Sequence, residues 1–468
     1  MRRDPRRVWR GWTGLALVCT LLPAMTLVTV CYGWWSPMSI VAAQSPTQTP
    51  AETFTPSSEV PVTAIPPAMP LVNAARDDDA LNILLLGSDT TNPVNAGRTD
   101  AIMVASINRT HGTVSLLSIP RDLFVYIPGW TMQRINTAFG YGEQIASSYG
   151  YTLLKETLRY NLGLRIDHYA RVDFNDFQTI IDALGGVEIT VDCALQDWIL
   201  KAPDLDPQNE ENWELLTLPV GVHVLDGRTA LWYARSRRTS SDFDRGRRQQ
   251  DLVRAIGLRL RQLGLLEQVS VLWGQVTDIV ETDLQVQDVL ELIPVALTLD
   301  SDRIAQYVFV PHVHVESWLT PSGAAVQLPI GEAVEALMRQ FLQPPTANRL
   351  VRSGPRVEIV NATGYAGMDR VAADLLAWEG FHAIAAGAEN RYAAQTTVYD
   401  FTGRIKGGIL DELLVALHLP SAPVVVSPDP GRTTDYRIIL GGDYRTCHHN
   451  VMPPVPTPTS APDSASAP

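Results

Sequence analysis

The chain has 468 residues, of which 46% are hydrophobic and 19% charged, and its formal net charge is −13. This composition is typical of a globular protein, and the length leaves room for roughly two or three domains. The acidic charge argues against general nucleic-acid binding, which requires a broad basic surface.

The N-terminus predicts a membrane anchor. Segment 1–10 is basic and segment 11–35 is uncharged. About 23 helical residues cross a ~30 Å hydrocarbon core, so segment 11–35 is long enough for one transmembrane helix. Because basic flanks stay in the cytoplasm, the main domains are expected outside the cell membrane, held by a single-pass signal-anchor. The alternative is a signal peptide cleaved near Ala43.

Two segments are poor in the aliphatic residues that build a core. Segment 36–78 is rich in Pro, Thr and Ser and predicts a semi-extended linker, and segment 447–468 predicts a disordered tail. Beyond the anchor, Cys193 and Cys447 are the remaining cysteines. They allow one disulfide and form no CxxC metal pattern.

Segment 79–345 opens with strand-like runs. LNILLLGSD reads as a buried strand with Asp89 just past its carboxyl end. DAIMVASIN and VSLLSIPRD, separated by four residues, predict a hairpin, and pairing of Asn108 with Thr113 would set Asp100 opposite Arg121. An ordinary cross-strand ion pair, contributing under ~1 kcal/mol, is the alternative interpretation of these two charges.

The next segment alternates helix and strand. VDFNDFQTIIDALGG carries apolar residues three or four apart before a double glycine, which predicts an amphipathic helix over 174–184 with its C-cap. VEITV follows as a strand. The alternation predicts an α/β domain with a mixed central sheet flanked by helices, whose functional residues lie at the strand ends.

The stretch ARSRRTSSDFDRGRRQQD holds six arginines between Arg235 and Arg248. From Leu252 onward, apolar residues recur at helical spacing, and the same line extends back through Gln249 to Arg245. Arginine is unexpected there, because the first turn of a helix already carries positive potential and free N–H groups. A bound phosphate would explain it. The alternative is an arginine-rich, solvated helix start.

These motifs resemble, in order, those of the LytR-CpsA-Psr family of cell-envelope enzymes. The blocks are NILLLGSD, GRTDAIMVASIN, VSLLSIPRD, RINTAFGYG, VDFNDFQTIIDALGGVEITV, LDGRTALWYARSR and DFDRGRRQQ. The resemblance covers roughly 81–264 closely and reaches about Gln343. It implies a Mg²⁺-dependent phosphotransferase of cell-wall biogenesis that moves a glycan polymer from a polyprenyl diphosphate carrier to a peptidoglycan hydroxyl, forming a phosphodiester.

The resemblance also implies roles for individual residues. The carboxylates that hold Mg²⁺ correspond to Asp89 and Asp100. The side chains around the diphosphate correspond to Arg98, Arg121, Arg235, Arg237 and Arg245, with Arg248 and Gln249 beside them. The candidate catalytic residues are Asp89, Arg98, Asp100, Arg121 and Arg245, and the candidate supporting residues are Asp122 and Asp242. Two positions depart from the family: Arg134 stands for a lysine and Thr91 for a common arginine.

A second, smaller α/β domain is predicted over 354–446. RVEIVNATGYAGMDRVAADLLAWEGF reads as strand, glycine turn and helix, and TTVYDF, PVVVS and DYRIILGGDY add strands. The segment resembles the LytR-type C-terminal domain of many family members. We expect it to bind the wall or a partner.

Two other functions fit part of the sequence. A nonenzymatic scaffold that binds envelope polymer or lipid carrier is disfavoured because Asp89 and Asp100 are retained. A transcriptional attenuator is disfavoured because no DNA-reading motif is recognisable. The expected partners are therefore the polyprenyl diphosphate-linked glycan, peptidoglycan and the membrane, with no nucleic acid.

Overall fold

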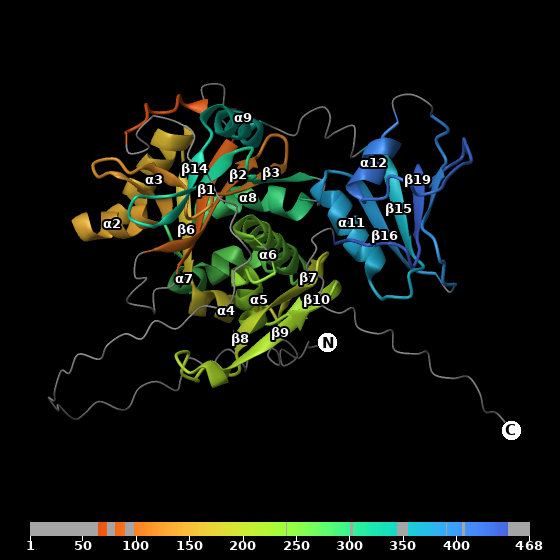
Figure 1. Ribbon diagram of the computed structural model, residues 1–468, viewed down its shortest axis with the longest axis horizontal. Coiled ribbons are helices and arrows are strands. Elements are labelled where there is room, and N and C mark those ends of the chain that lie inside the picture. Colours follow the sequence, from red (N-terminus) through yellow and green to blue (C-terminus); the bar gives the residue numbers. More distant parts are fainter. Residues whose placement is uncertain are drawn as a thin grey trace, which may run out of the picture. The chain divides into compact units, whose positions relative to one another are not determined.

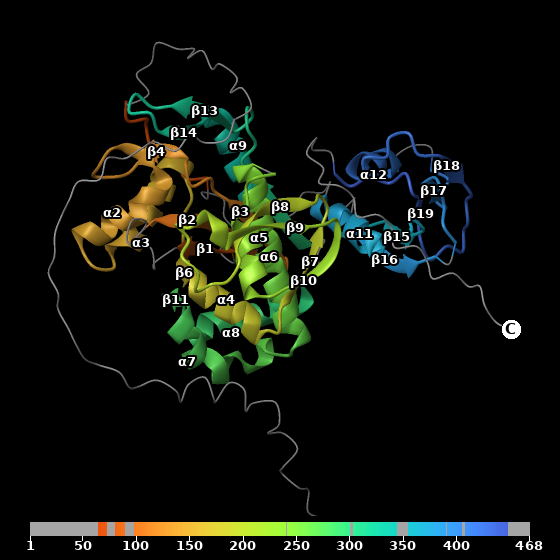
Figure 2. The same cartoon turned by 60° about the horizontal axis from the view of Figure 1, so that its bottom comes forward.

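The computed structural model describes most of the chain from residue 64 to residue 447 (Figures 1 and 2). The described ranges are 64–72, 80–88, 98–239, 241–299, 303–343, 354–389, 391–404 and 408–447. They all belong to one compact unit, Pro56–Pro468. The expected segment 1–10, the anchor 11–35, most of the linker 36–78 and the tail beyond Cys447 lie outside them. Within the described ranges, no helix is both long and apolar enough to cross a bilayer.

A six-stranded sheet lies at the centre of the first domain, in the order β11-β6-β1-β2-β3-β12 (Figure 1). Its strands are β1 (Ala80–Ser88), β2 (Thr99–Asn108), β3 (Thr113–Ser118), β6 (His168–Asp173), β11 (Glu281–Thr282) and β12 (Ile304–Val308). Strand β2 runs antiparallel to β1 and β3, whereas β6 runs parallel to β1 and β12 runs parallel to β3. The predicted mixed sheet is confirmed.

Helices and shorter strands surround this sheet. The helices are α2 (Ala138–Ile145), α3 (Tyr149–Leu162), α4 (Phe174–Ala183), α5 (Gly227–Arg235), α6 (Asp242–Gln262), α7 (Val269–Ile279), α8 (Val286–Thr298) and α9 (Gly331–Leu342). The shorter strands are β4 (Phe124–Tyr126), β5 (Met132–Arg134), β7 (Val187–Val191), β8 (Leu195–Leu200), β9 (Trp213–Leu218), β10 (Gly221–Leu225), β13 (Val315–Leu319) and β14 (Ala325–Pro329). The helix expected over 174–184 is α4, and it ends before Gly185 and Gly186, both with positive φ.

The two faces of the central sheet are packed to different degrees. Leu84 and Leu86 of β1 join a large buried core with α3 and α9. Leu85 lies between them and faces the other side, because successive side chains of a strand alternate. The buried cluster on that side is small, and Leu85 lies only at its margin. The less densely packed face, next to α6, leaves room for a cavity.

The hairpin of β2 and β3 has the register that its short loop predicts. Asn108 pairs with Thr113, and the pairing continues to Met103 opposite Ser118. Strand β1 departs from regular pairing near the open end of the hairpin, because Gly87 pairs with Ala101 but Ser88 pairs with Thr99. The residue between those partners, at position 100, is therefore the extra residue of a β-bulge, a feature that redirects a side chain.

The C-terminal domain has its own sheet and core. Its elements are β15 (Arg356–Asn361), α11 (Met368–Trp378), β16 (His382–Ala388), β17 (Thr397–Asp400), α12 (Leu410–Ala416), β18 (Val424–Val426) and β19 (Tyr436–Leu440). The strand order is β16-β15-β19-β17-β18, and all neighbours are parallel except β17 and β19. A buried cluster that includes Val357, Leu376 and Ile438 fills the space between sheet and helices. The predicted smaller α/β domain is confirmed.

A disulfide joins the two domains. Cys193, just after β7, is bonded to Cys447, which follows β19 at a sequence separation of 254 residues. Cys447 was expected to open the disordered tail, and that expectation was wrong, because the bond fixes this residue to the first domain. The one disulfide that the cysteine content allowed is therefore the one present.

We expect a protein cut at a protease site inserted between Gln343 and Gly354 to migrate as one species on a non-reducing gel and as two after reduction. Replacing Cys193 and Cys447 by alanine should separate the cut fragments without reductant. The same double substitution should lower the free energy of unfolding of the uncut protein by about 2–5 kcal/mol, measured by urea denaturation. Separation of the wild-type fragments without reductant would contradict the bond.

Candidate functional site

A cavity of about 490 Å³ opens between the less densely packed face of the central sheet and helices α4, α5 and α6. Its walls come from β1, β2 and β6 on one side and from the three helices on the other. The polar residues that line it are Asp100, Arg121, Arg235, Arg237, Arg245 and Gln249. Its apolar lining includes Leu85, Met103, Val172, Phe174, Phe177, Ile180, Leu252, Val253 and Ile256.

The lining changes from polar to apolar along helix α6 and along strand β2. On α6, Arg245 and Gln249 come first, and Val253 and Ile256 follow further along the helix. The distance from Arg245 to Ile256 is about 16 Å along the helix axis, at 1.5 Å per residue. On β2 the lining likewise changes from Asp100 to Met103. The cavity therefore suits an elongated ligand with an anionic end and an apolar end.

The bulge in β2 sets a carboxylate against an arginine at the polar end. Arg121 Nη1 donates a hydrogen bond to Asp100 Oδ1 at 2.6 Å, as the hairpin register predicts. Asp122 Oδ2 lies 3.4 Å from Arg121 Nε, and Asp122 Oδ1 accepts from Arg134 Nη1 at 3.2 Å. Asp122 does not line the cavity, so its contacts hold Arg121 and Arg134 from behind.

Arg245 lies in the first turn of α6, as predicted, and only 6% of its surface is exposed. The helix supplies its own N-terminal anion. Ser241 Oγ accepts from the backbone N–H of Asp244 at 3.2 Å, and Asp244 Oδ2 accepts from the backbone N–H of Ser241 at 2.8 Å. This capping box satisfies N–H groups that were expected to be free. The capping box thus occupies part of the helix N-terminus, and the arginine side chains are the groups from this helix start that reach the cavity.

The turn between α5 and α6 presents two more arginines. Helix α5 ends at Arg235 and the chain continues extended through Ser236, as expected. The guanidinium of Arg235 lies over the ring of Phe174 at 4.6 Å. The backbone N–H of Arg237 donates to Asp197 Oδ2 at 2.7 Å, which fixes the turn to β8. Arg235 and Arg237 thus both line the cavity from a braced segment.

Arg248 and Gln249 were both expected beside the diphosphate, but only Gln249 lines the cavity. Its side-chain amide donates to the carbonyl of Ala234 at 3.2 Å. Arg248 is 8% exposed, and its guanidinium donates to the carbonyls of Tyr233, at 3.0 Å, and of Ser236. The expectation for Arg248 is corrected accordingly: its guanidinium caps the end of α5, where carbonyl groups need donors.

Two of the other expected site residues lie wholly or partly outside the described geometry, and a third does not line the cavity. Asp89 is not among the described residues, and of Asp242 only the backbone position at the start of α6 is described. Arg98 is described and exposed, and it does not line the cavity. No group of three or more His, Cys, Asp or Glu residues that could hold a metal is found in the described part of the chain.

Sequence reasoning missed the residues that fix the first turns of α6 on the sheet. Gln250 is fully buried, and its side-chain amide donates to Ser118 Oγ and to the carbonyl of Tyr307, both at 2.9 Å. Ser118 Oγ in turn donates to the carbonyl of Gly246 at 3.0 Å. A Cβ at Gly246 would lie 3.0 Å from Ser118 Cβ, which is tighter than an ordinary contact, so glycine favours the close approach of α6 to β3. The sequence feature that could have indicated this contact is Gly246, a glycine within a segment that otherwise favours a helix.

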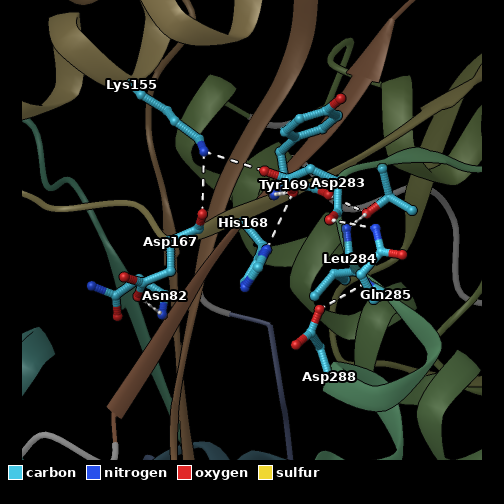
Figure 3. Close-up of polar contacts among 10 residues, drawn as sticks. Asn82, Lys155, Asp167, His168, Tyr169, Asp283, Leu284, Gln285 and Asp288 are labelled. Carbon is cyan, nitrogen blue, oxygen red and sulfur yellow. Dashed lines mark hydrogen bonds and ion pairs between the residues drawn. The ribbon is translucent and has the colours of Figure 1, made fainter.

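A separate polar cluster fixes β6, another wall of the cavity (Figure 3). Asp283, just after β11, accepts from the backbone N–H of Tyr169 at 2.8 Å and from Lys155 Nζ at 3.4 Å. Lys155 Nζ also donates to the carbonyl of Asp167 at 3.2 Å, and His168 Nδ1 lies 3.5 Å from Asp283 Oδ1. None of these residues lines the cavity. The cluster therefore holds the strand that supplies Val172.

A buried charged cluster lies on the opposite side of α6. Burial raises the pKa of the Asp251 carboxyl from its ordinary value of 3.8 to about 7; Arg254 and Arg247 oppose this rise, and Asp374 and Asp192 add to it. Asp251 Oδ1 is 3.8 Å from Arg254 Nη2. The Asp251 carboxyl therefore keeps its proton to a higher pH than an exposed aspartate does.

Family models match both domains. The model of the LytR_cpsA_psr family matches residues 42–328. A second model, described as LytR cell envelope-related transcriptional attenuator, matches residues 355–444. Together they cover the two domains that the fold separates.

Curated relatives and a solved structure resemble part of this chain. The probable cell wall biosynthesis protein LcpB of Corynebacterium glutamicum is 37% identical over 205 residues, 41% of this chain and 43% of LcpB. The polyisoprenyl-teichoic acid–peptidoglycan teichoic acid transferase TagT of Bacillus subtilis is 29% identical over 227 residues, 48% of this chain and 66% of TagT. The crystal structure of B. subtilis TagV matches with a TM-score of 0.46 and 24% identity, covering 57% of this chain and 97% of TagV. The chain thus spans between 43% and 66% of the length of these two curated relatives.

Replacing Asp251 by asparagine should change how stability depends on pH. Between about pH 4 and pH 7 the unfolded state loses the Asp251 proton while the folded state keeps it, so this group lowers stability as pH rises, by about 1.4 kcal/mol per pH unit. Asp251→Asn should therefore gain stability relative to wild type over that range and hold a constant advantage above it. Urea denaturation at pH 4.5, 6 and 8 measures the difference.

The groups that face Asp251 are Arg247 and Arg254 on α6, Tyr233 on α5, Asp192 after β7 and Asp374 on α11. These residues are the same in the wild type and in Asp251→Asn. The contribution of their titration to stability therefore largely cancels when the two free energies of unfolding are subtracted. A stability difference that stays the same at all three pH values would show that Asp251 keeps an ordinary pKa.

Proposed function

The chain belongs to the LytR-CpsA-Psr family, and from that premise we propose that it transfers a glycan polymer from a polyprenyl diphosphate carrier to a peptidoglycan hydroxyl. The observation that carries the proposal is the cavity with arginines at one end and apolar walls at the other. A polyprenyl diphosphate has the same two-part character. The relative TagT is named for a reaction of this class.

The polar end suits the two phosphates. Arg121, Arg235, Arg237 and Arg245 converge on it from the end of the hairpin, the α5–α6 turn and the first turn of α6. Guanidinium forks match phosphate oxygens with two hydrogen bonds each. The apolar end, lined by side chains of α4 and α6, takes the start of the prenyl chain.

The reaction requires positioning of the reactants and neutralisation of charge more than it requires covalent catalysis by a protein nucleophile. The acceptor oxygen forms a bond to the phosphorus nearer the sugar, and the bond from that phosphorus to the bridging oxygen breaks. Polyprenyl phosphate leaves with the electron pair, and the acceptor proton passes to a base or to solvent. Charge develops on the nonbridging and leaving oxygens, where the arginine side chains stabilise it.

Magnesium is part of the proposal. Asp100 fits a ligand role because it lies at the polar end, and its Oδ2 has no hydrogen-bond partner among the described residues. Asp89 is proposed as the second carboxylate. Mg²⁺ prefers one or two carboxylates together with phosphate oxygens and water, so a larger acidic cluster is not required. The bound ion would neutralise charge on the diphosphate.

We propose that the protein is held in the cell membrane by segment 11–35, with both domains outside. The basic segment 1–10 supports this orientation. The Cys193–Cys447 disulfide also supports it, because such bonds persist in oxidising compartments and are rare in the cytosol.

The decisive experiment supplies full-length protein in detergent with a polyprenyl diphosphate-linked saccharide, Mg²⁺ and peptidoglycan fragments. Mass spectrometry should detect polyprenyl monophosphate and the phosphodiester-linked product. Arg245→Ala should lower kcat/KM by about 10²–10³-fold, as expected for loss of one group that stabilises transition-state charge.

Arg238→Ala is the matched control. Arg238 belongs to the same arginine-rich stretch, but it is exposed, it donates to Gln196, and it does not line the cavity. Its loss should change kcat/KM less than twofold. Wild-type protein that binds the carrier without turnover would favour the scaffold, and equal effects of the two substitutions would remove Arg245 from the site.

Phe177→Ala tests the apolar end. Phe177 lines the cavity from α4, so its truncation should weaken binding of farnesyl diphosphate about tenfold, or 1.4 kcal/mol. Binding of inorganic pyrophosphate, which has no apolar part, should stay the same. Titration calorimetry with both probes measures this, and an equal loss for both would place the prenyl chain elsewhere.

A further inference from the structure

Helix α6 carries two functional stripes on nearly opposite sides. Successive residues in an α-helix are rotated by about 100°, so residues two apart are separated by about 200°. One stripe, formed by Arg245, Gln249, Leu252 and Ile256, lines the phosphate cavity. The other starts two residues later and consists of Arg247, Asp251, Arg254 and Leu258. This second stripe faces the C-terminal domain.

The second stripe is held by two side chains of α11. Arg254 donates to Asp374 Oδ1, and the guanidinium groups of Arg247 and Arg254 lie over the ring of Trp378 at 4.5 and 5.6 Å. The side chain of Arg254 is 9% exposed and that of Asp374 is 21% exposed. Thr190 Oγ1 of β7 donates to Asp374 Oδ2 at 2.5 Å, so both oxygens of this carboxylate are engaged.

The first domain also contacts α6 along this stripe. Arg247 lies 3.4 Å from Asp192 in an ion pair, and Ala255 belongs to a buried cluster with side chains of β7. A cavity of about 400 Å³ nevertheless lies between α6, β7 and the C-terminal domain, and Arg254 and Asp374 are among the residues that line it. On the other side of the helix lies the phosphate cavity. The contacts from α11 thus support a helix that has a cavity on each of two sides.

The C-terminal domain is attached to the first domain independently of α6. Arg370 forms an ion pair with Glu188 of β7, and Thr446 Oγ1 donates to the carbonyl of Asp192. The Cys193–Cys447 disulfide adds a covalent link. Asp374 takes part in both the attachment, through Thr190, and the support of α6, whereas Arg370 and Thr446 take part in the attachment alone. A substitution of Arg370 therefore tests attachment separately.

We propose that Asp374 and Trp378 are positioning residues for the phosphate cavity, acting through Arg247 and Arg254 to hold α6 where Arg245 and Gln249 meet a diphosphate. The C-terminal domain thereby completes the site without touching the substrate. This inference rests on the proposed function for the identity of the ligand. Its mechanical part, support of α6 by α11, does not depend on the ligand.

The position of α6 is sensitive to the loss of its contacts with α11, and diphosphate binding is sensitive to the position of α6. Removing Asp374 leaves the buried guanidinium of Arg254 with only the more distant carboxylate of Asp251, at 3.8 Å, and this loss of charge compensation favours a shift of the helix. A misplacement of about 1 Å at a reacting group lowers a rate by around 10²-fold. A small movement of α6 is therefore enough to weaken diphosphate binding.

The test uses full-length protein carrying Asp374→Asn or Trp378→Leu. Two readouts are measured: binding of inorganic pyrophosphate by titration calorimetry, and hydrogen exchange of the backbone amides of 245–250. We expect the dissociation constant to rise about tenfold and exchange to become faster in both variants. Asp374→Glu should recover part of each effect, because it restores the charge.

Arg370→Gln is the matched control, since it removes an ion pair between the same two domains that does not involve α6. It should leave both readouts unchanged. Unchanged exchange and binding in Asp374→Asn and Trp378→Leu would overturn the proposal, and so would equal effects in Arg370→Gln. If wild-type protein binds no pyrophosphate, the proposed function fails, and hydrogen exchange still decides whether α11 supports α6.

Discussion

Burial of like charges in one helical turn is the constraint on which this structure depends. Guanidinium groups near the start of α6 lose hydration and repel each other, and the helix dipole adds to the cost. The protein offsets this cost with contacts behind and beside the helix. Gln250 and Gly246 fix the turn on β3, Arg248 binds carbonyls of α5, and Asp244 completes the cap. The arginines that line the cavity are therefore held in place before any anion binds.

The central sheet serves two purposes because successive side chains of each strand point to opposite faces. One face builds a large buried core with α3 and α9, which stabilises the first domain by burying apolar side chains. The other face is packed more loosely, and its side chains, among them Leu85 and Met103, form the wall of a cavity. The sheet thus forms a wall of the cavity on this face, where no large buried core lies against it. The bulge at Asp100 uses the same strand to place a carboxylate where the apolar wall ends.

Much of the polar end could be predicted from the sequence, because local rules determine it. A short hairpin loop sets the register, which predicted the contact of Asp100 with Arg121, and helical spacing predicted that Arg245 is buried. Arg248 was misplaced because its neighbours are backbone carbonyls of another helix, which leave no sequence pattern. The cluster around Asp251 was not anticipated, since it forms only where two domains meet. The spacing of apolar residues in a sequence describes one helix or strand at a time, so it does not predict contacts between domains.

The covalent link between the domains has a consequence for how the protein matures. Cys193 and Cys447 are 254 residues apart, so the first domain can finish folding long before its partner cysteine has been synthesised. During that interval Cys193 carries a thiol that has no partner cysteine yet, and the contacts of α11 with α6 have not formed. Maturation is thus ordered in time: the sheet forms first, the C-terminal domain docks later, and oxidation then makes the arrangement permanent.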